Sequence, residues 1–238
     1  MKLLQPTNYR HELKYLCSNQ SVTVLEARLQ TILQTDNHSI DGRKYTVISI
    51  YFDDYQDSCL LANYMGVSDR YKYRIRIYNF DTNTINLEKK IKHDNLSYKK
   101  KAVLSLQDVQ WILINDSASL LRETDDSLIT EFCLNMQSRL FSPKAIVQYE
   151  RVAFVESVSN TRITLDTNIV ASSDFQNFNR REKLVFPVFG SGLHVLEVKY
   201  DDLLPEYVRR AVQMKTLNQN TISKYCLARQ TLKKYWSR

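Results

Sequence analysis

The sequence predicts an α+β fold built on a mostly antiparallel β-sheet. Segments in which apolar and polar residues alternate outnumber segments with helical periodicity. The helical segments interrupt the strands in blocks, whereas a parallel sheet would need a crossover helix after nearly every strand. No repeat, low-complexity segment or Gly/Ser-rich linker divides the 238 residues. We therefore expect a single domain over residues 1–238.

The N-terminal part of the chain supplies two strands and one helix. Residues 9–17 alternate, with Glu12 and Lys14 on the charged face. Residues 22–33 carry an apolar stripe at helical spacing, which predicts an amphipathic helix. Residues 45–52 are rich in β-branched and aromatic side chains, which favour a strand, and the Asp53-Asp54 pair that follows predicts a turn.

Three consecutive strands with one charged face each follow at hairpin spacing. Residues 70–78 read R-Y-K-Y-R-I-R-I-Y, so every second side chain is basic. Residues 85–92 and 98–104 repeat the pattern. The charged faces of the three strands carry Arg70, Lys72, Arg74, Arg76, Glu88, Lys90, Lys92, Lys99 and Lys101.

The C-terminal half contains helices on both sides of three further strands. The polar face of the first strand carries Tyr149 and Arg151, that of the second carries Arg162, and that of the third carries Glu197 and Lys199. The last helix has Asn220 or Thr221 as a plausible N-cap. The expected helices span residues 105–114, 127–140, 202–214 and 220–236, and the expected strands span 144–156, 161–170 and 194–201.

The composition points to an anionic partner and a reducing compartment. Lys and Arg number 33 against 26 Asp and Glu, which gives a net charge of +7. This excess favours nucleic acid, polyphosphate, a nucleotide or an anionic membrane surface. The four cysteines form no C-x-x-C pair, so we expect reduced thiols without a structural zinc. The N-terminus lacks a signal peptide core, and no apolar run is long enough to span a membrane.

The charged strand faces allow two interpretations. In an open sheet they would be a solvated outer face. In a closed barrel they would line a polar interior able to bind a ligand. Nine bases against three acids favour a bound polyanion, because unpaired buried charge is costly, and the few carboxylates suit Mg²⁺ or Mn²⁺. The bases are Lys14, Arg74, Arg76, Lys90, Lys99, Lys101, Arg151, Arg162 and Lys199, and the acids are Glu12, Glu88 and Glu197.

The helix near Thr221 offers a second phosphate site. Its first turn contains Ser223 and Lys224, and a hydroxyl, an ammonium and free backbone N–H groups together can hold an anion. An ordinary capped surface helix would show the same residues, so this feature alone decides nothing.

Several other chemistries lack their residues. The sequence contains no Gly-rich phosphate loop, no H-E-x-x-H motif and no G-x-S-x-G motif. Tyr71 and Tyr73 alternate with Lys72 and Arg74, so rings and charges point to opposite faces. A platform for single-stranded nucleic acid would need both on one face, so we expect no nucleic-acid partner.

Eight short motifs in series resemble the VTC domain, the polyphosphate polymerase domain of the vacuolar transporter chaperone complex. That domain belongs to the triphosphate tunnel metalloenzyme superfamily, together with the CYTH proteins. The resemblance covers nearly the whole chain. The motifs are RHELKY (10–15), IYFD (50–53), YRIRIY (73–78), LEKK (87–90), QYERVAF (148–154), TRITLD (161–166), LEVKY (196–200) and SKY (223–225).

The resemblance implies a closed antiparallel β-barrel, a tunnel lined by bases and glutamates, with peripheral helices and a C-terminal helix at the tunnel. The catalytic residues it implies are Arg74, Arg76, Lys90, Arg151, Arg162 and Lys224. The residues expected to bind substrate are Lys14, Lys99, Lys101, Tyr149, Lys199 and Ser223, of which Lys199 is included for its place on the charged face. Glu197 matches the metal-binding glutamate, and Glu12 and Glu88 are further expected metal or water ligands.

The implied reaction transfers the γ-phosphoryl group of ATP to a growing polyphosphate chain, with Mn²⁺ or Mg²⁺ as the cofactor. Relatives with this layout, which lacks a phosphate-sensing domain and membrane spans, look bacterial. We expect a cytoplasmic protein that could work with a membrane-protein partner at the inner face of the membrane. Two alternatives remain open: a triphosphatase with the same tunnel, and a non-enzymatic sensor of polyphosphate or nucleotides.

Overall fold

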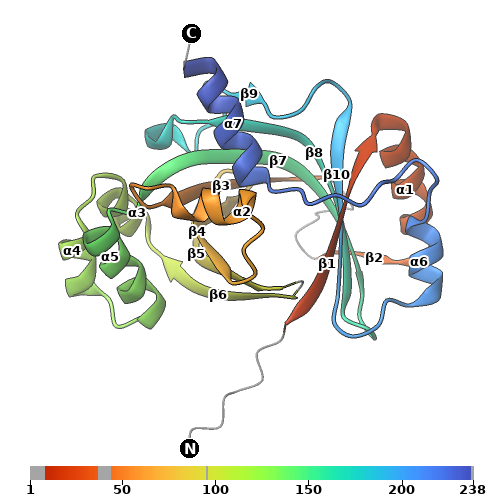
Figure 1. The fold of residues 1–238 in the computed structure, drawn as a ribbon, viewed down its shortest axis with the longest axis horizontal. Helices are drawn as coiled ribbons and strands as arrows, with labels where there is room; N and C mark the ends of the chain where they lie inside the picture. Colours follow the sequence, from red (N-terminus) through yellow and green to blue (C-terminus); the bar gives the residue numbers. More distant parts are fainter. Residues whose placement is uncertain (1–8, 37–43, 95, 237–238) are drawn as a thin grey trace, which may run out of the picture.

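Eight antiparallel strands form a closed β-barrel in the computed structural model, which describes residues 9–36, 44–94 and 96–236 (Figure 1). Their order around the barrel is β7-β3-β4-β5-β6-β1-β10-β8, and β8 pairs with β7 to close the ring. The predicted α+β fold and closed barrel are therefore confirmed. The strands are β1 (Arg10–Ser18), β3 (Tyr45–Asp53), β4 (Arg70–Tyr78), β5 (Asp81–His93), β6 (Leu96–Leu104), β7 (Ser142–Glu156), β8 (Thr161–Ser172) and β10 (Leu193–Tyr200).

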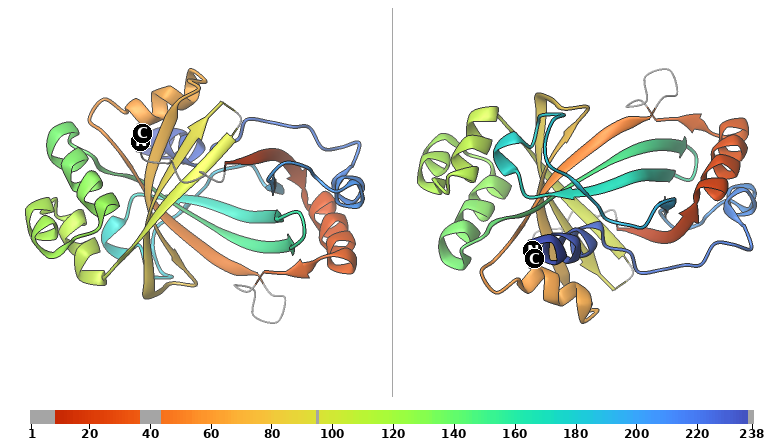
Figure 2. Two further views of the ribbon diagram at one scale, coloured as in Figure 1. Left: turned by 90° about the horizontal axis from the view of Figure 1, so that it is seen from below. Right: turned by 90° about the horizontal axis from the view of Figure 1, so that it is seen from above.

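Two apolar cores lie outside the barrel, on opposite sides (Figure 2). One core joins the outer faces of β3 to β6 to α3 (Leu106–Leu113), α4 (Ser117–Glu123) and α5 (Ser127–Arg139). The other joins β1, β7, β8 and β10 to α1 (Asn19–Ile32) and α6 (Glu206–Val212). Helices thus cover the apolar outer faces, and the charged faces of the strands point into the barrel.

A third core lies inside the barrel, where α7 (Lys224–Trp236) fills one end (Figure 1). Here the inner faces of β3, β7 and β8 are apolar. Asn168 has a φ of 52°, and the β7–β8 register shifts nearby, so the odd-numbered β8 residues Ile169 and Ala171 face inward beyond this point. This core includes Val47, Tyr51, Val147, Tyr149, Ile169, Ala171, Tyr225, Ala228 and Leu232.

The seam between β1 and β6 is the weakest junction of the barrel. These strands pair at only two positions, Arg10 with Ser97 and His11 with Leu96. Beyond that point the segment before α7 takes the place of β6. Gln219 bridges to Tyr15, and the backbone N–H of Asn220 donates to the carbonyl of Lys14 at 2.9 Å. This pairing leads the chain to the barrel interior just before α7 begins.

The start of the last helix differs from the prediction. We expected it at Asn220, whereas α7 begins at Lys224. The backbone of Asn220 is hydrogen-bonded to β1, so residues 219–222 are not helical. Ser223 caps the helix instead, because its Oγ accepts from the N–H of Cys226 at 3.4 Å.

The other predicted strands and helices are present with small changes. All eight predicted strands are present, and the helix expected at 202–214 is shorter because it begins only after Pro205. None of the helices in the described ranges is long and apolar enough to cross a membrane. The sequence pattern missed α2 (Ser58–Tyr64), α4, the short strands β2 (Gln34–Thr35) and β9 (Phe186–Pro187), and a 3₁₀ turn at Phe175–Asn177.

Candidate functional site: a charged barrel interior

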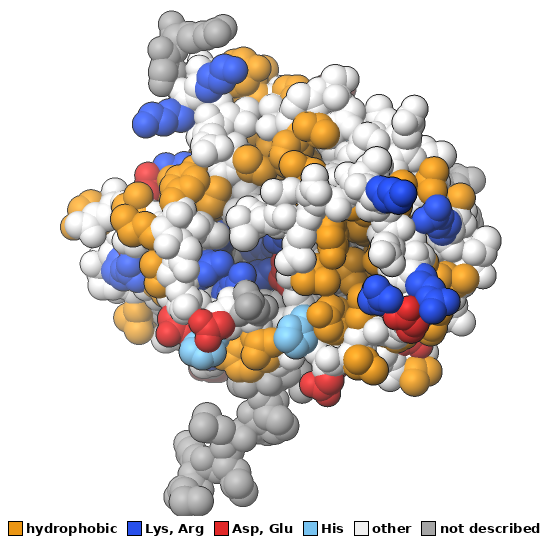
Figure 3. Space-filling view, turned by 45° about the vertical axis from the view of Figure 1, so that its right-hand side comes forward, with side chains coloured by type: hydrophobic (Ala, Val, Ile, Leu, Met, Phe, Trp, Pro, Cys, Tyr) orange, Lys and Arg blue, Asp and Glu red, His pale blue; other side chains and the backbone are white. Residues whose placement is uncertain are grey.

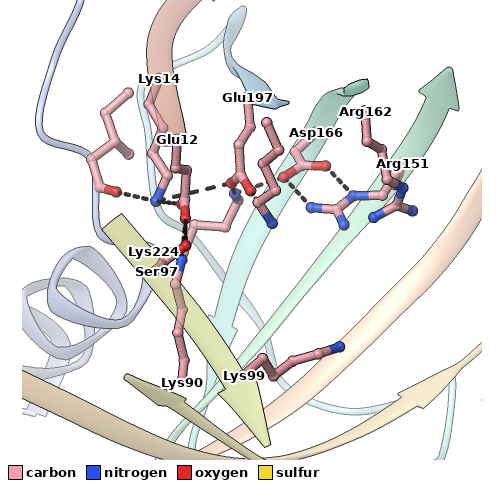
Figure 4. Close-up of polar contacts among 12 residues, drawn as sticks. Glu12, Lys14, Lys90, Ser97, Lys99, Arg151, Arg162, Asp166, Glu197 and Lys224 are labelled. Carbon is pink, nitrogen blue, oxygen red and sulfur yellow. Dashed lines mark hydrogen bonds and ion pairs between the residues drawn. The ribbon is translucent and has the colours of Figure 1, made fainter. Parts of the chain in front are cut away.

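Seven strands and α7 send charged side chains into the barrel (Figure 4). The cause is the strand alternation, because every second residue of a strand points to the same side. From one side of the molecule, Lys and Arg side chains are visible deep in an opening between two lobes (Figure 3). These side chains gather around four carboxylates, which divide the site into three connected clusters.

The first cluster surrounds Asp166, which is inaccessible to solvent. Arg151 donates to it through two bonds, Nε to Oδ1 at 2.6 Å and Nη2 to Oδ2 at 2.8 Å. Nζ of Lys224, at the first residue of α7, lies 2.6 Å from the same Oδ2. Burial alone would raise the pKa of Asp166, but Arg151 and Lys224 lower it. Two cations on one carboxylate leave this cluster with a net positive charge.

The second cluster contains Glu12 and Glu197 on the paired strands β1 and β10. Nζ of Lys14 lies 2.8 Å from Glu12 and 3.9 Å from Glu197. Lys90 also contacts Glu12, and Lys199 lies 2.6 Å from Glu197. Burial opposes ionisation of the two glutamates, yet the surrounding lysines hold both pKa values well below their ordinary range. Both carboxylates are therefore charged at neutral pH.

The third cluster surrounds Glu88 on β5. Its carboxylate accepts from Arg74 Nε at 2.6 Å and from Lys99 Nζ at 2.8 Å, and Arg76 lies 3.8 Å away. Arg76 also donates to the hydroxyl of Tyr149 at 3.3 Å. Because Glu88 is almost fully buried, these contacts fix the guanidinium groups in place.

Two predicted site residues lie at the margin of this network. Arg162 donates to Asp36, which follows β2, and to the hydroxyl of Tyr45. Lys101 follows the same strand alternation but is exposed and has no ion pair within the described residues. The other predicted residues come together inside the barrel, whereas these two reach it only from its wall and rim.

Burial shifts the protonation equilibrium of Lys90. Desolvation, together with the charges of Lys14 and Lys199, lowers the pKa of Lys90 to about 7 against the opposing effect of Glu12. Burial raises the pKa of Tyr51, but Arg74 and Arg76 outweigh it and bring the value to about 8. The positive charge of neighbouring bases contributes to both shifts.

That excess is large enough to require a counter-ion. Four carboxylates, Glu12, Glu88, Asp166 and Glu197, face more than twice as many bases. Such a cluster cannot be sealed from water unless an anion joins it, since unpaired buried charge costs several kcal/mol. The interior is therefore suited to a polyanion. The bases are Lys14, Lys72, Arg74, Arg76, Lys90, Lys99, Arg151, Lys199 and Lys224.

The carboxylates fit a divalent cation only in part. Among the described residues, no three acidic, His or Cys side chains form a metal-binding group. Glu12 and Glu197 both contact Lys14, which places the two carboxylates close together. Glu88 shares no contact with them. Mg²⁺ often takes one or two carboxylates and completes its shell with phosphate oxygens and water. Glu12 and Glu197 fit that mode, and the metal role of all three glutamates stays a prediction.

Two central residues were absent from the predicted site. Asp166 joins Arg151 to Lys224, and Lys72 points at the start of α7. Both could have been found, since Asp166 shares a strand face with Arg162, and Lys72 shares one with Arg74.

A family comparison identifies the domain type. The model of the VTC domain matches residues 9–233. The chain belongs to the VTC domain family. This membership supports a polyphosphate-related tunnel enzyme of the phosphotransferase type that binds triphosphate and polyphosphate. No curated protein matches the chain.

Solved structures show only distant similarity to this VTC domain. The PH1012 protein from Pyrococcus horikoshii OT3 is 10% identical, covers 92% of this chain and 98% of its own, and has a TM-score of 0.49. A candidate adenylate cyclase from Bacillus halodurans is 14% identical over 85% and 86% of the two chains, with a TM-score of 0.48. At these values the similarities bear on neither mechanism nor substrate.

Proposed function

We propose that this VTC domain is a polyphosphate polymerase that transfers the γ-phosphoryl group of ATP to the end of a polyphosphate chain. The observation that carries the proposal is the excess of fixed bases around Glu12, Glu88, Asp166 and Glu197 inside a closed barrel. A chain of phosphates supplies the missing negative charge at several neighbouring positions. Family membership adds the expectation of a polyphosphate-related reaction.

The reaction needs no protein nucleophile. A terminal oxygen of the acceptor chain attacks the γ-phosphorus, the bond from that phosphorus to the β–γ bridging oxygen breaks, and ADP leaves. Phosphoryl transfer depends mainly on alignment and on neutralising the equatorial oxygens. Arg74 and Arg151 are suited to that task because Glu88 and Asp166 hold their guanidinium groups rigidly.

Glu12 and Glu197 are the proposed ligands of Mn²⁺ or Mg²⁺. When bound, such an ion would offset charge on the phosphates and help to orient them. Lys14 now contacts both carboxylates, so metal binding would require its ammonium to move toward phosphate. Titration of the metal in the presence of tripolyphosphate should saturate for the native protein and fail for Glu197→Gln. An unchanged titration would place the metal elsewhere.

The proposal is tested by incubating the purified protein with ATP and Mn²⁺ and separating the products by size. A ladder of phosphate chains together with ADP is the expected result, and a chelator should abolish it. Orthophosphate without chains would overturn the polymerase and identify a triphosphatase that uses the same interior. Tight binding of triphosphate without turnover would identify a sensor.

A further inference from the structure

Lys72 differs from the other bases of the interior. It lies on β4, on the same face as Arg74 and Arg76, and its Nζ donates to the Oγ of Ser223 at 2.9 Å. The Tyr225 ring lies 5.6 Å from the same Nζ. Each other base of the interior has a carboxylate within 4.0 Å, whereas Lys72 has none among the described residues.

Asp53, at the end of the neighbouring strand β3, is unavailable to Lys72. Its Oδ1 accepts from the backbone N–H of Cys59 at 2.9 Å. Its Oδ2 accepts from the N–H of Leu60 at 2.9 Å and from the hydroxyl of Tyr225 at 2.7 Å. These bonds anchor α2 and α7 to the barrel, so both oxygens of the Asp53 carboxylate already accept hydrogen bonds from other groups. The ammonium of Lys72 therefore has no carboxylate partner in the part of the chain that the structure describes.

Two further cationic features lie beside Lys72. Ser223, its partner, caps α7, so the positive end of the helix dipole faces the same place. Nζ of Lys14 donates to the carbonyl of Ile222 at 3.0 Å, one residue before that cap. Lys72 and Lys14 thus both contact the residues at the start of α7. Burial, together with the charges of Lys14 and Arg70, lowers the pKa of Lys72 to about 8 against the opposing effects of Cys226 and Tyr51.

We propose that Lys72 binds a phosphate group of the polyphosphate or triphosphate at the α7 end of the interior, where the phosphate supplies the anion that Lys72 lacks among the described residues. This inference rests on the proposed binding of a phosphate chain and adds one contact to it. Lys72 is then a substrate-binding residue in addition to its contact with Ser223.

The test is calorimetric titration of tripolyphosphate into the full chain and its Lys72→Met and Lys72→Arg variants. A charge-assisted hydrogen bond lost from a binding site weakens affinity by about 10- to 100-fold, and we expect a loss of that size for Lys72→Met. Lys72→Arg should retain most of the affinity, because it keeps the charge. Lys100→Met removes one charge from the other face of β6 and is the matched control.

The outcomes separate this inference from the proposed function. If the native protein binds no tripolyphosphate, the proposed function fails. If the native protein and Lys72→Met bind equally while Lys100→Met is normal, only the role of Lys72 fails. A merely structural Lys72 would lower the thermal midpoint of Lys72→Met and of Lys72→Arg and weaken binding in both. Weakened binding in Lys72→Met with an unchanged midpoint supports the phosphate contact.

Discussion

Arg151 and Asp166 form an ion pair that the barrel removes almost completely from water. Loss of one partner of such a pair leaves a buried charge and costs about 3–5 kcal/mol. Because Lys224 still contacts Asp166, we expect Arg151→Ala to lose about 3 kcal/mol in the free energy of unfolding. Urea denaturation measures this loss. Adding Asp166→Asn should restore part of the stability, and an unchanged midpoint for Arg151→Ala would refute the pairing.

Lys90 makes phosphate binding depend on pH. Its pKa of about 7 leaves the amine mostly neutral above pH 8, whereas a bound phosphate favours the charged form. Affinity for tripolyphosphate should therefore fall between pH 7 and pH 9, with proton uptake on binding. Calorimetry in buffers of different ionisation enthalpy measures that uptake. Lys72 titrates in the same window, so Lys90→Met should reduce the uptake without abolishing it, and uptake equal to that of the native protein would contradict the assignment.

At the scale of elements, α7 is held in the barrel by apolar contacts as well as by charge. Leu232 is buried against the inner faces of the strands in the core that α7 shares with them. Leu232→Ala should lower the free energy of unfolding by about 2–4 kcal/mol, as for other buried leucines. Lys234→Ala, on an exposed position of the same helix, should change it by less than about 0.5 kcal/mol. Equal effects of the two substitutions in thermal or urea unfolding would mean that α7 does not pack inside.

The sequence predicts strands better than it predicts the last helix. Most of the eight strands show a two-residue alternation, because one face packs against helices and the other lines the interior. The strand β3 was predicted instead from its β-branched and aromatic residues. The predicted start of α7 was wrong because the backbone of Asn220 pairs with Lys14, more than 200 positions earlier in the chain. No local pattern reports such a contact. The helices α2 and α4 span seven residues each, too few for a periodic stripe to stand out.

At the scale of the whole molecule, the alternation of polar and apolar residues could not predict that the sheet closes into a barrel. An open sheet with one solvated face has the same pattern, and only the pairing of β8 with β7 and of β1 with β6 decides between them. The charged residues were largely predictable because they follow the strand period. Which base pairs with which of Glu12, Glu88, Asp166 and Glu197 was not predictable, because it depends on which strands become neighbours.

An enclosed interior should prefer compact phosphate chains to nucleic acid. All of its bases except Lys72 contact carboxylates, and Tyr71 and Tyr73 belong to the outer core, away from the charges. Tripolyphosphate should therefore displace a bound fluorescent polyphosphate at a concentration at least about tenfold lower than a single-stranded oligonucleotide of equal charge, a preference of about 1.4 kcal/mol. Fluorescence anisotropy measures both displacements. Stronger competition by the oligonucleotide would favour an outer binding surface.

The most direct test of the polymerase is transfer of the terminal phosphoryl group of γ-labelled ATP to a polyphosphate primer of defined length. In the presence of Mn²⁺, the label should appear in chains longer than the primer, with one ADP released for each phosphate added. Arg74→Met should reduce this transfer strongly, while Lys100→Met leaves it unchanged. Label found only in orthophosphate, at a rate that the primer does not affect, would contradict the account.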